Sequence, residues 1–176
     1  AMGGTIYVES KPGQGSCFEV LIDLKIAKER PAFLSSKEEE TPNGAILEGM
    51  HFLCAEDNEL NAEILTELLK MKGAECTICE NGQKVVETFE QSVPGAYDMI
   101  LMDVQMPVMN GYDAARAIRR SLHKQAGTIP IIAMTANAFS EDIRHSLTAG
   151  MNAHISKPVD MMLLEKTIRS IKSGGG

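Results

Sequence analysis

The part of the chain from Met50 onward alternates short apolar runs with amphipathic stretches, and this alternation restricts the fold more than any other feature. Such a pattern is typical of a parallel sheet whose strands are connected by helices. The apolar runs predict five strands, near residues 50–55, 74–79, 98–102, 129–134 and 152–155. We therefore predict an α/β domain with a doubly wound five-stranded parallel sheet and helices on both of its faces.

The stretch after the first predicted strand has the spacing of an amphipathic helix. Its large apolar side chains fall on one helical face: Leu60, Ile64, Leu65, Leu68 and Leu69. Three later helices are predicted to begin after the capping residues Asn110, Ser140 and Asp160. Gly150 follows one of these patterns and predicts a left-handed helix stop.

The first 47 residues differ in character from the rest. Residues 1–24 predict a β-hairpin that turns at Pro12-Gly13-Gln14-Gly15, and a lone hairpin is only marginally stable in water. Residues 25–47 are rich in proline, serine and glutamate, which is typical of a linker. We therefore divide the chain into a hairpin, this linker, an α/β domain over 48–172 and a short tail over 173–176.

Composition excludes several classes of protein. With 17 basic and 24 acidic residues the formal net charge is -7, and no Lys/Arg-rich block offers a nucleic-acid groove. The four cysteines are too scattered for a disulfide framework, which favours a cytoplasmic location. No apolar run is long enough to cross a bilayer, so we expect no membrane contact by this fragment. The chain starts at Ala1 and ends in three glycines, so we expect it to be a piece of a longer parent, which could itself be anchored in a membrane.

Polar side chains collect where the predicted strands end. The first strand leads to Glu56 and Asp57, the third to Asp103, the fourth to Thr135 and the fifth to Lys157. Ligands of open parallel sheets bind beyond these carboxyl ends, so we expect the five side chains to share one pocket. Crowded carboxylates need a cation, and Mg²⁺ (or Mn²⁺) prefers oxygen ligands. Each residue has an ordinary explanation by itself, but their joint placement favours a metal and phosphoryl site.

The motifs at these strand ends resemble response-regulator receiver domains. The segment 99–111 (MILMDVQMPVMNG) is similar to their phosphoacceptor loop, and Glu56-Asp57, Met134-Thr135-Ala136 and Ser156-Lys157-Pro158 follow the family's order. The resemblance spans about residues 48–172. It implies a flavodoxin-like sheet with strand order 2-1-3-4-5.

The resemblance also implies a role for each site residue. Asp103 would be the phosphoacceptor that takes a phosphoryl group from a phosphohistidine. Mg²⁺ would be held directly by Asp57, Asp103 and the backbone carbonyl of Gln105. Glu56 would hold it through a water molecule. Thr135 and Lys157 would contact the phosphoryl oxygens, and the chemistry would then be mostly positioning and charge neutralisation.

Further expectations come from the same family. The switch position three residues before the lysine is usually Tyr or Phe, but here it is His154. The lifetime of the phosphorylated state would be tuned by Gln105, two residues after Asp103, and by Asn137, two residues after Thr135. The Lys157–Pro158 peptide bond is predicted to be cis.

The hairpin has a resemblance of its own. The segments Gly3–Ser10 and Pro12–Phe18 are similar to the closing strands of a histidine-kinase ATP-binding domain. The chain lacks that domain's nucleotide loop and a phosphodonor histidine motif, so only self-phosphorylation and self-dephosphorylation are expected of it. The two resemblances together predict the C-terminal part of a hybrid sensor histidine kinase. Its partner would be a kinase dimerisation domain or a histidine phosphotransfer domain, and an uncovered hairpin face allows self-association.

Two alternative functions are compatible with the same residues. One is a phosphatase of the haloacid-dehalogenase type, but these enzymes usually carry a second Asp two residues after the nucleophile, where this chain has Gln105. The other is a pseudo-receiver that is never phosphorylated and only binds proteins. The chain has the acidic pair Glu56-Asp57 as well as Asp103 and Lys157, and their presence argues against a pseudo-receiver.

Overall fold

A computed structural model describes residues 5–11, 13, 15–21, 46–136 and 140–173 of the chain. The chain divides into two compact units, Ala1–Pro42 and Asn43–Gly176. No helix within these described ranges is long and apolar enough to span a bilayer.

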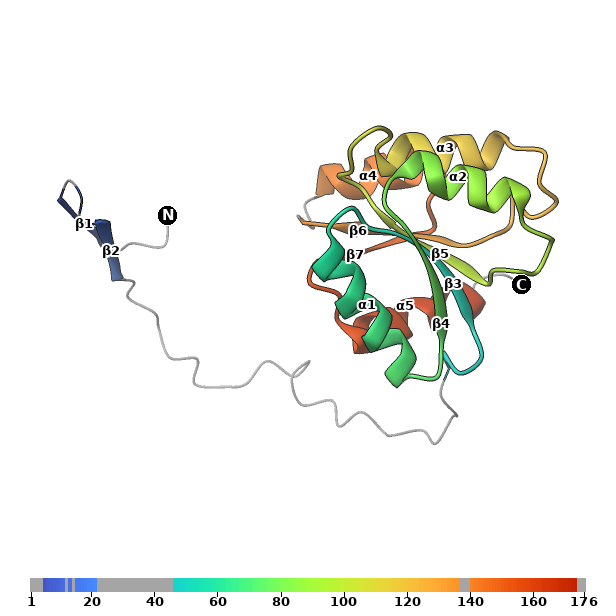
Figure 1. Cartoon of the computed structure of the whole chain (residues 1–176), viewed down its shortest axis with the longest axis horizontal. Helices are drawn as coiled ribbons and strands as arrows, with labels where there is room; N and C mark the ends of the chain where they lie inside the picture. Colours follow the sequence, from blue (N-terminus) through green and yellow to red (C-terminus); the bar gives the residue numbers. More distant parts are fainter. Residues whose placement is uncertain (1–4, 12, 14, 22–45, 137–139, 174–176) are drawn as a thin grey trace. The chain divides into compact units, whose positions relative to one another are not determined.

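The second unit is built on a five-stranded parallel sheet (Figure 1). Its strand order is β4-β3-β5-β6-β7, which is the predicted order 2-1-3-4-5 when the two hairpin strands are left out. The predicted strand bounds agree with the structure to within two residues. The strands are β3 (His51–Ala55), β4 (Glu75–Cys79), β5 (Met99–Asp103), β6 (Ile131–Thr135) and β7 (Ala153–Ser156).

Helices cover both faces of this sheet, as predicted. The helices are α1 (Glu59–Met71), α2 (Gly82–Gln91), α3 (Gly111–Arg120), α4 (Ser140–Thr148) and α5 (Met161–Ser173). Figure 1 shows α1 and α5 on one face and α2, α3 and α4 on the other. The central strand β5 is buried along its whole length because helices pack on both of its sides.

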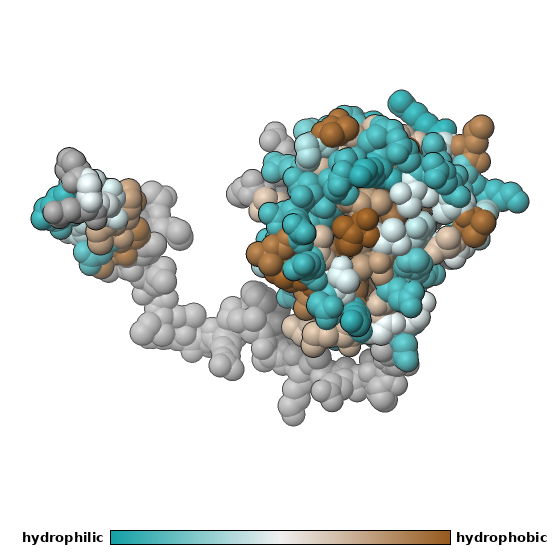
Figure 2. Space-filling view, in the orientation of Figure 1, coloured by the Kyte–Doolittle hydropathy of each residue, from teal (hydrophilic) through white to brown (hydrophobic). Residues whose placement is uncertain are grey.

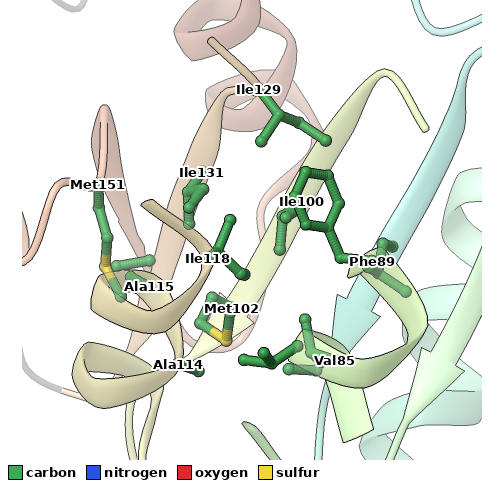
Figure 3. Close-up of a cluster of buried hydrophobic side chains, with 14 of the residues drawn as sticks. Val85, Phe89, Ile100, Met102, Ala114, Ala115, Ile118, Ile129, Ile131 and Met151 are labelled. Atoms are coloured by element: carbon green, nitrogen blue, oxygen red, sulfur yellow. The ribbon is translucent and has the colours of Figure 1, made fainter. Parts of the chain in front are cut away.

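Two apolar cores fill the space between the sheet and its helices. On the α2 and α3 side, Phe89 and Ile118 pack with Ile100 and Met102 of β5 (Figure 3). On the α1 and α5 side, Leu65 and Leu69 belong to a second core with Phe52, Leu101 and Ile168 among its members. Leu60 and Ile64 of α1, predicted to share the buried face, are instead 64% and 51% exposed. The apolar stripe of α1 is therefore wider than the face that the sheet covers.

Short polar side chains begin the helices next to the carboxyl edge of the sheet. The side-chain oxygens of Asn58, Asn81, Asn110 and Asp160 accept hydrogen bonds from backbone N–H groups in the first turns of α1, α2, α3 and α5. The predicted caps Asn110 and Asp160 are thus confirmed, whereas α4 begins at Ser140 itself. Gly150 has a φ of 91°, as its predicted helix stop requires.

The first unit contains the predicted hairpin, formed by the antiparallel strands β1 (Thr5–Lys11) and β2 (Gly15–Leu21). Its register pairs Ile6 with Val20 and Val8 with Phe18, so these four apolar side chains share one face. All four are exposed. Ile22 and Leu24, which continue the predicted strand, lie outside the described residues.

The α/β domain begins slightly earlier than the sequence suggests. Leu47, the last residue of the predicted linker, is only 1% exposed and belongs to the core beneath α1 and α5. The backbone N–H of Gly49 donates to the carbonyl of Gly73, which fixes this segment beside the α1–β4 turn. The packed unit therefore includes residues before Met50. Figure 2 shows that exposed apolar side chains on the visible face of this unit are separated by hydrophilic ones.

Replacing Phe89 by Ala should lower the free energy of unfolding of the α/β domain by about 3–5 kcal/mol, because loss of the ring leaves a cavity inside one of the two cores. Urea denaturation followed by circular dichroism measures this change. Phe18→Ala is the matched control, since Phe18 is exposed on the hairpin. An equal loss in both variants would contradict this account of the core.

Candidate functional site

The five predicted site residues all lie at the carboxyl edge of the sheet. Asp103 is the last residue of β5 and Thr135 the last of β6, while Glu56 and Asp57 directly follow β3. Lys157 follows β7, and its backbone N–H donates to the carbonyl of Thr135. Residues that are far apart in sequence are thus brought together because parallel strands end at one edge.

The Lys157 ammonium joins two buried carboxylates. Its Nζ lies 2.6 Å from Asp103 Oδ2 and 2.6 Å from Glu56 Oε2. The side chains of Glu56 and Asp103 are only 2% and 6% exposed, and that of Lys157 is 22% exposed. Buried charges of one sign repel strongly, so this ammonium compensates a pair that would otherwise be costly.

Burial and charge act against each other on the pKa values of this group. Burial raises the pKa of Asp103 above its ordinary value, although hydrogen bonds from Lys157 and from the Gln105 N–H oppose the rise. Burial lowers the pKa of Lys157, but the hydrogen bonds to Asp103 and Glu56 outweigh it, and the net shift is upward. Lys157 is therefore held in its charged form.

Three carboxylates of the site are close enough to hold one metal ion. One oxygen each from Glu56, Asp57 and Asp103 lies within 4.8 Å of the others, and Asp57 is the exposed member. An all-oxygen donor set with one exposed carboxylate suits Mg²⁺, which keeps several of its waters. The residues present therefore fit the predicted cofactor.

Tight backbone packing fixes the loop that follows Asp103. The N–H of Gln105 donates to Asp103 Oδ1 at 3.0 Å, and the N–H of Gly111 donates to the carbonyl of Val104 at 3.0 Å. A Cβ at Gly111 would collide with the carbonyl oxygen of Asp103, so only glycine allows α3 to start this close to Asp103.

Two further predicted positions, Thr135 and His154, lie on the neighbouring strands β6 and β7. Thr135 is buried at the end of β6, and His154 is half-buried on β7, where it pairs with Ala133. The Lys157–Pro158 bond is cis, as predicted. Asn137 lies outside the described residues.

Comparison with known proteins identifies the family. Residues 52–169 match the model of the response regulator receiver domain. The chain belongs to the response regulator receiver domain family. The aerobic respiration control sensor protein ArcB of Escherichia coli is 32% identical over 170 residues, which cover 96% of this chain and 20% of ArcB. The predicted family is thereby confirmed.

Solved structures agree in both sequence and shape. The receiver domain of the Pseudomonas aeruginosa sensor histidine kinase PA1611, with a magnesium ion in its active-site cleft, is 36% identical. Its TM-score is 0.61 over 70% of this chain and 98% of that chain. The receiver domain of Ssk1 from Saccharomyces cerevisiae, crystallised with the histidine phosphotransfer protein Ypd1, is 32% identical and has a TM-score of 0.61. The match covers 69% of this chain and 87% of that chain. The predicted flavodoxin-like receiver fold is confirmed.

The receiver site has a supporting residue that the sequence did not reveal. Asn61, in the first turn and a half of α1, donates from Nδ2 to Glu56 Oε1 at 3.1 Å. The backbone N–H of Asn58 lies 3.4 Å from the same oxygen. These groups orient Glu56 while its other oxygen contacts Lys157. No sequence pattern distinguishes Asn61 from an ordinary polar residue on a helix surface.

An apolar pocket of about 360 Å³ opens beside the charged receiver site. Glu56 and Lys157 are among its lining residues, and the rest come from α1, β6 and the β7–α5 loop, including Ile64, Met134 and Val159. The charged centre therefore borders an apolar surface on the α1 side.

Replacing Lys157 by Met should lower the free energy of unfolding by about 2 kcal/mol in metal-free buffer, because two buried carboxylates lose their shared counter-ion. Without Lys157 the pKa of Asp103 rises further above its value in the unfolded chain. The penalty should therefore be largest at neutral pH and fade as the pH falls and the Asp103 carboxyl takes up a proton. Urea denaturation at several pH values tests this, with the exposed Lys166→Met as control. A pH-independent penalty would contradict the explanation.

Proposed function

We propose that the chain accepts a phosphoryl group from a phosphohistidine onto Asp103, in a Mg²⁺-dependent reaction within a two-component phosphorelay. The observation that carries the proposal is the contact of Asp103 with Lys157 inside a cluster of three carboxylates. Membership of the receiver family and the similarity to a receiver crystallised with a histidine phosphotransfer protein support it.

The proposed transfer is a single in-line displacement. An oxygen of the Asp103 carboxylate attacks phosphorus, the bond between phosphorus and the histidine nitrogen breaks, and an acyl phosphate forms. The leaving imidazole nitrogen takes up a proton from solvent. Hydrolysis of the acyl phosphate later returns the carboxylate and inorganic phosphate.

The side chains around Asp103 would share the charge that develops. Asp57 and Glu56 would hold Mg²⁺ or Mn²⁺ together with Asp103 and the backbone carbonyl of Gln105. The bound ion would supply charge neutralisation to the phosphoryl oxygens. Lys157 would pair with another of these oxygens, since its ammonium already lies at the acceptor carboxylate.

Further residues are proposed to act after the transfer. Thr135 would move toward the phosphoryl group and contact it, and His154 would occupy the switch position on β7. Gln105 and Asn137 would tune the lifetime of the acyl phosphate. The burial of Thr135 at the strand end beside Asp103 supports its part in this proposal.

Asp103→Asn should abolish labelling by phosphoimidazole, whereas the unaltered chain should gain one phosphoryl group only when Mg²⁺ is present. Intact-mass spectrometry detects the added group. Asp98→Asn is the matched control, because Asp98 is exposed and directly precedes Met99, the first residue of β5, at the end of the strand opposite Asp103. Undiminished labelling of the Asp103→Asn variant would refute the acceptor role. Absence of labelling in the unaltered chain would favour a pseudo-receiver, and steady turnover of a small phosphate ester would favour a phosphatase.

We also propose that the chain is the C-terminal part of a hybrid sensor histidine kinase. It spans only 7% to 20% of the length of the curated relatives it matches, among them a hybrid kinase of Dictyostelium discoideum and ArcB. The match to ArcB covers 96% of the chain and therefore extends beyond the receiver domain. Residues 1–24 would then close an ATP-binding domain, 25–47 would be a linker, 48–172 the receiver and 173–176 a tail.

The proposed partners follow from this position. The donor would be a kinase dimerisation domain or a histidine phosphotransfer domain, and the receiver would work in the cytoplasm, with no contact of its own to nucleic acid or membrane. The exposed apolar face of the hairpin would be covered by the rest of the ATP-binding domain or, in its absence, by a second copy of this chain.

A further inference from the structure

Two cysteine side chains meet on the face of the sheet that α1 and α5 cover. The register pairs Phe52 of β3 with Cys76 of β4, so Cys54 is the diagonal neighbour of Cys76. Residues two apart on a strand point to the same face, and both cysteines pack in the core of that face. Their side chains are hydrogen-bonded to each other. The sheet therefore holds a pair of thiols in contact, far along the chain from one another.

The two thiols differ in how far solvent reaches them. Cys54 is fully buried, whereas Cys76 is half-buried on β4, which is an edge strand of the sheet. A small reagent in solution therefore meets Cys76 first. Cys54 lies behind it as a neighbour that the reagent does not reach.

The groups around Cys76 stabilise its thiolate, which is the nucleophilic form of cysteine. The hydrogen bond with Cys54 has the largest effect and lowers the pKa of Cys76 to about 6, although partial burial opposes the shift. Thr66 of α1 and the charge of His51 act in the same direction as Cys54. The Cys76 thiol donates to Thr66 Oγ1 at 3.4 Å, and a hydroxyl rotates freely enough to donate back once that thiol has lost its proton.

We propose that Cys76 is a reactive thiol that hydroperoxides oxidise to a sulfenic acid, and that Cys54 is the positioning residue that donates to its sulfur. In this step the Cys76 sulfur attacks one oxygen of the peroxide, so that a sulfur–oxygen bond forms as the oxygen–oxygen bond breaks. The sulfur loses two electrons, and the leaving oxygen gains them and takes up a proton from solvent. The reaction does not involve Asp103, so it stands or falls separately from the proposed phosphorylation.

The unaltered chain supplies its own comparison. Cys17 is exposed on β2, so exposure alone favours oxidation there rather than at Cys76. The chain is treated with hydrogen peroxide at neutral pH in the presence of dimedone, which traps sulfenic acids, and the labelled peptides are followed by mass spectrometry. The adduct should form about tenfold faster at Cys76 than at Cys17, because a thiol with the pKa of Cys76 is mostly ionised at neutral pH and an ordinary one is not. An equal or faster rate at Cys17 would overturn the proposal.

Three variants test the part of Cys54. Cys54→Ala removes the S–H donor and should slow adduct formation at Cys76 about tenfold, whereas Cys54→Ser keeps a donor and should retain most of the rate. Cys79→Ala is the matched control, since Cys79 is another buried thiol but packs in the core on the opposite face of the sheet. Circular dichroism checks that each variant is folded. An unchanged rate in Cys54→Ala, or an equal loss in Cys79→Ala, would contradict the role of the thiol pair, and the comparison with Cys17 needs no substitution at all.

Discussion

The receiver site depends on one lysine that neutralises two buried carboxylates. Glu56, Asp103 and Lys157 come from three different strand ends, and their charged atoms meet within 2.6 Å of the Lys157 ammonium. In a parallel sheet this meeting requires β3, β5 and β7 to end at the same level. A shift of one residue in any of these strands would turn its side chains to the opposite face and leave buried charges without a partner.

The sequence was sufficient to predict the sheet, its order and which polar residues meet at its carboxyl edge. Apolar runs mark strands that are buried on both faces, and the residue after each run marks the functional edge. The meeting of Asp103 and Lys157 at this edge was therefore predictable by position together with the family motifs, whereas their roles are proposals. The same reasoning places Thr135 at this edge, although its part in signalling is still a proposal.

Other features depend on three-dimensional detail that periodicity does not encode. The exposure of Leu60 and Ile64 was not predicted, because an apolar stripe does not say how much of it the sheet covers. The hydrogen bond from Asn61 to Glu56 depends on the position of α1 relative to β3. The hydrogen bond from the Gly82 N–H to the Met109 carbonyl joins α2 to the loop after β5, and these segments are distant in sequence.

The burial of β5 on both faces affects how a signal can leave the site. Any displacement of this strand would disturb both apolar cores at once, so the Asp103 carboxylate sits on a strand that resists deformation. Motion is easier in segments with less packing. The proposed phosphorylation of Asp103 would thus take place at a fixed point, and its effect would have to spread outward through the loops and the edge strand β7.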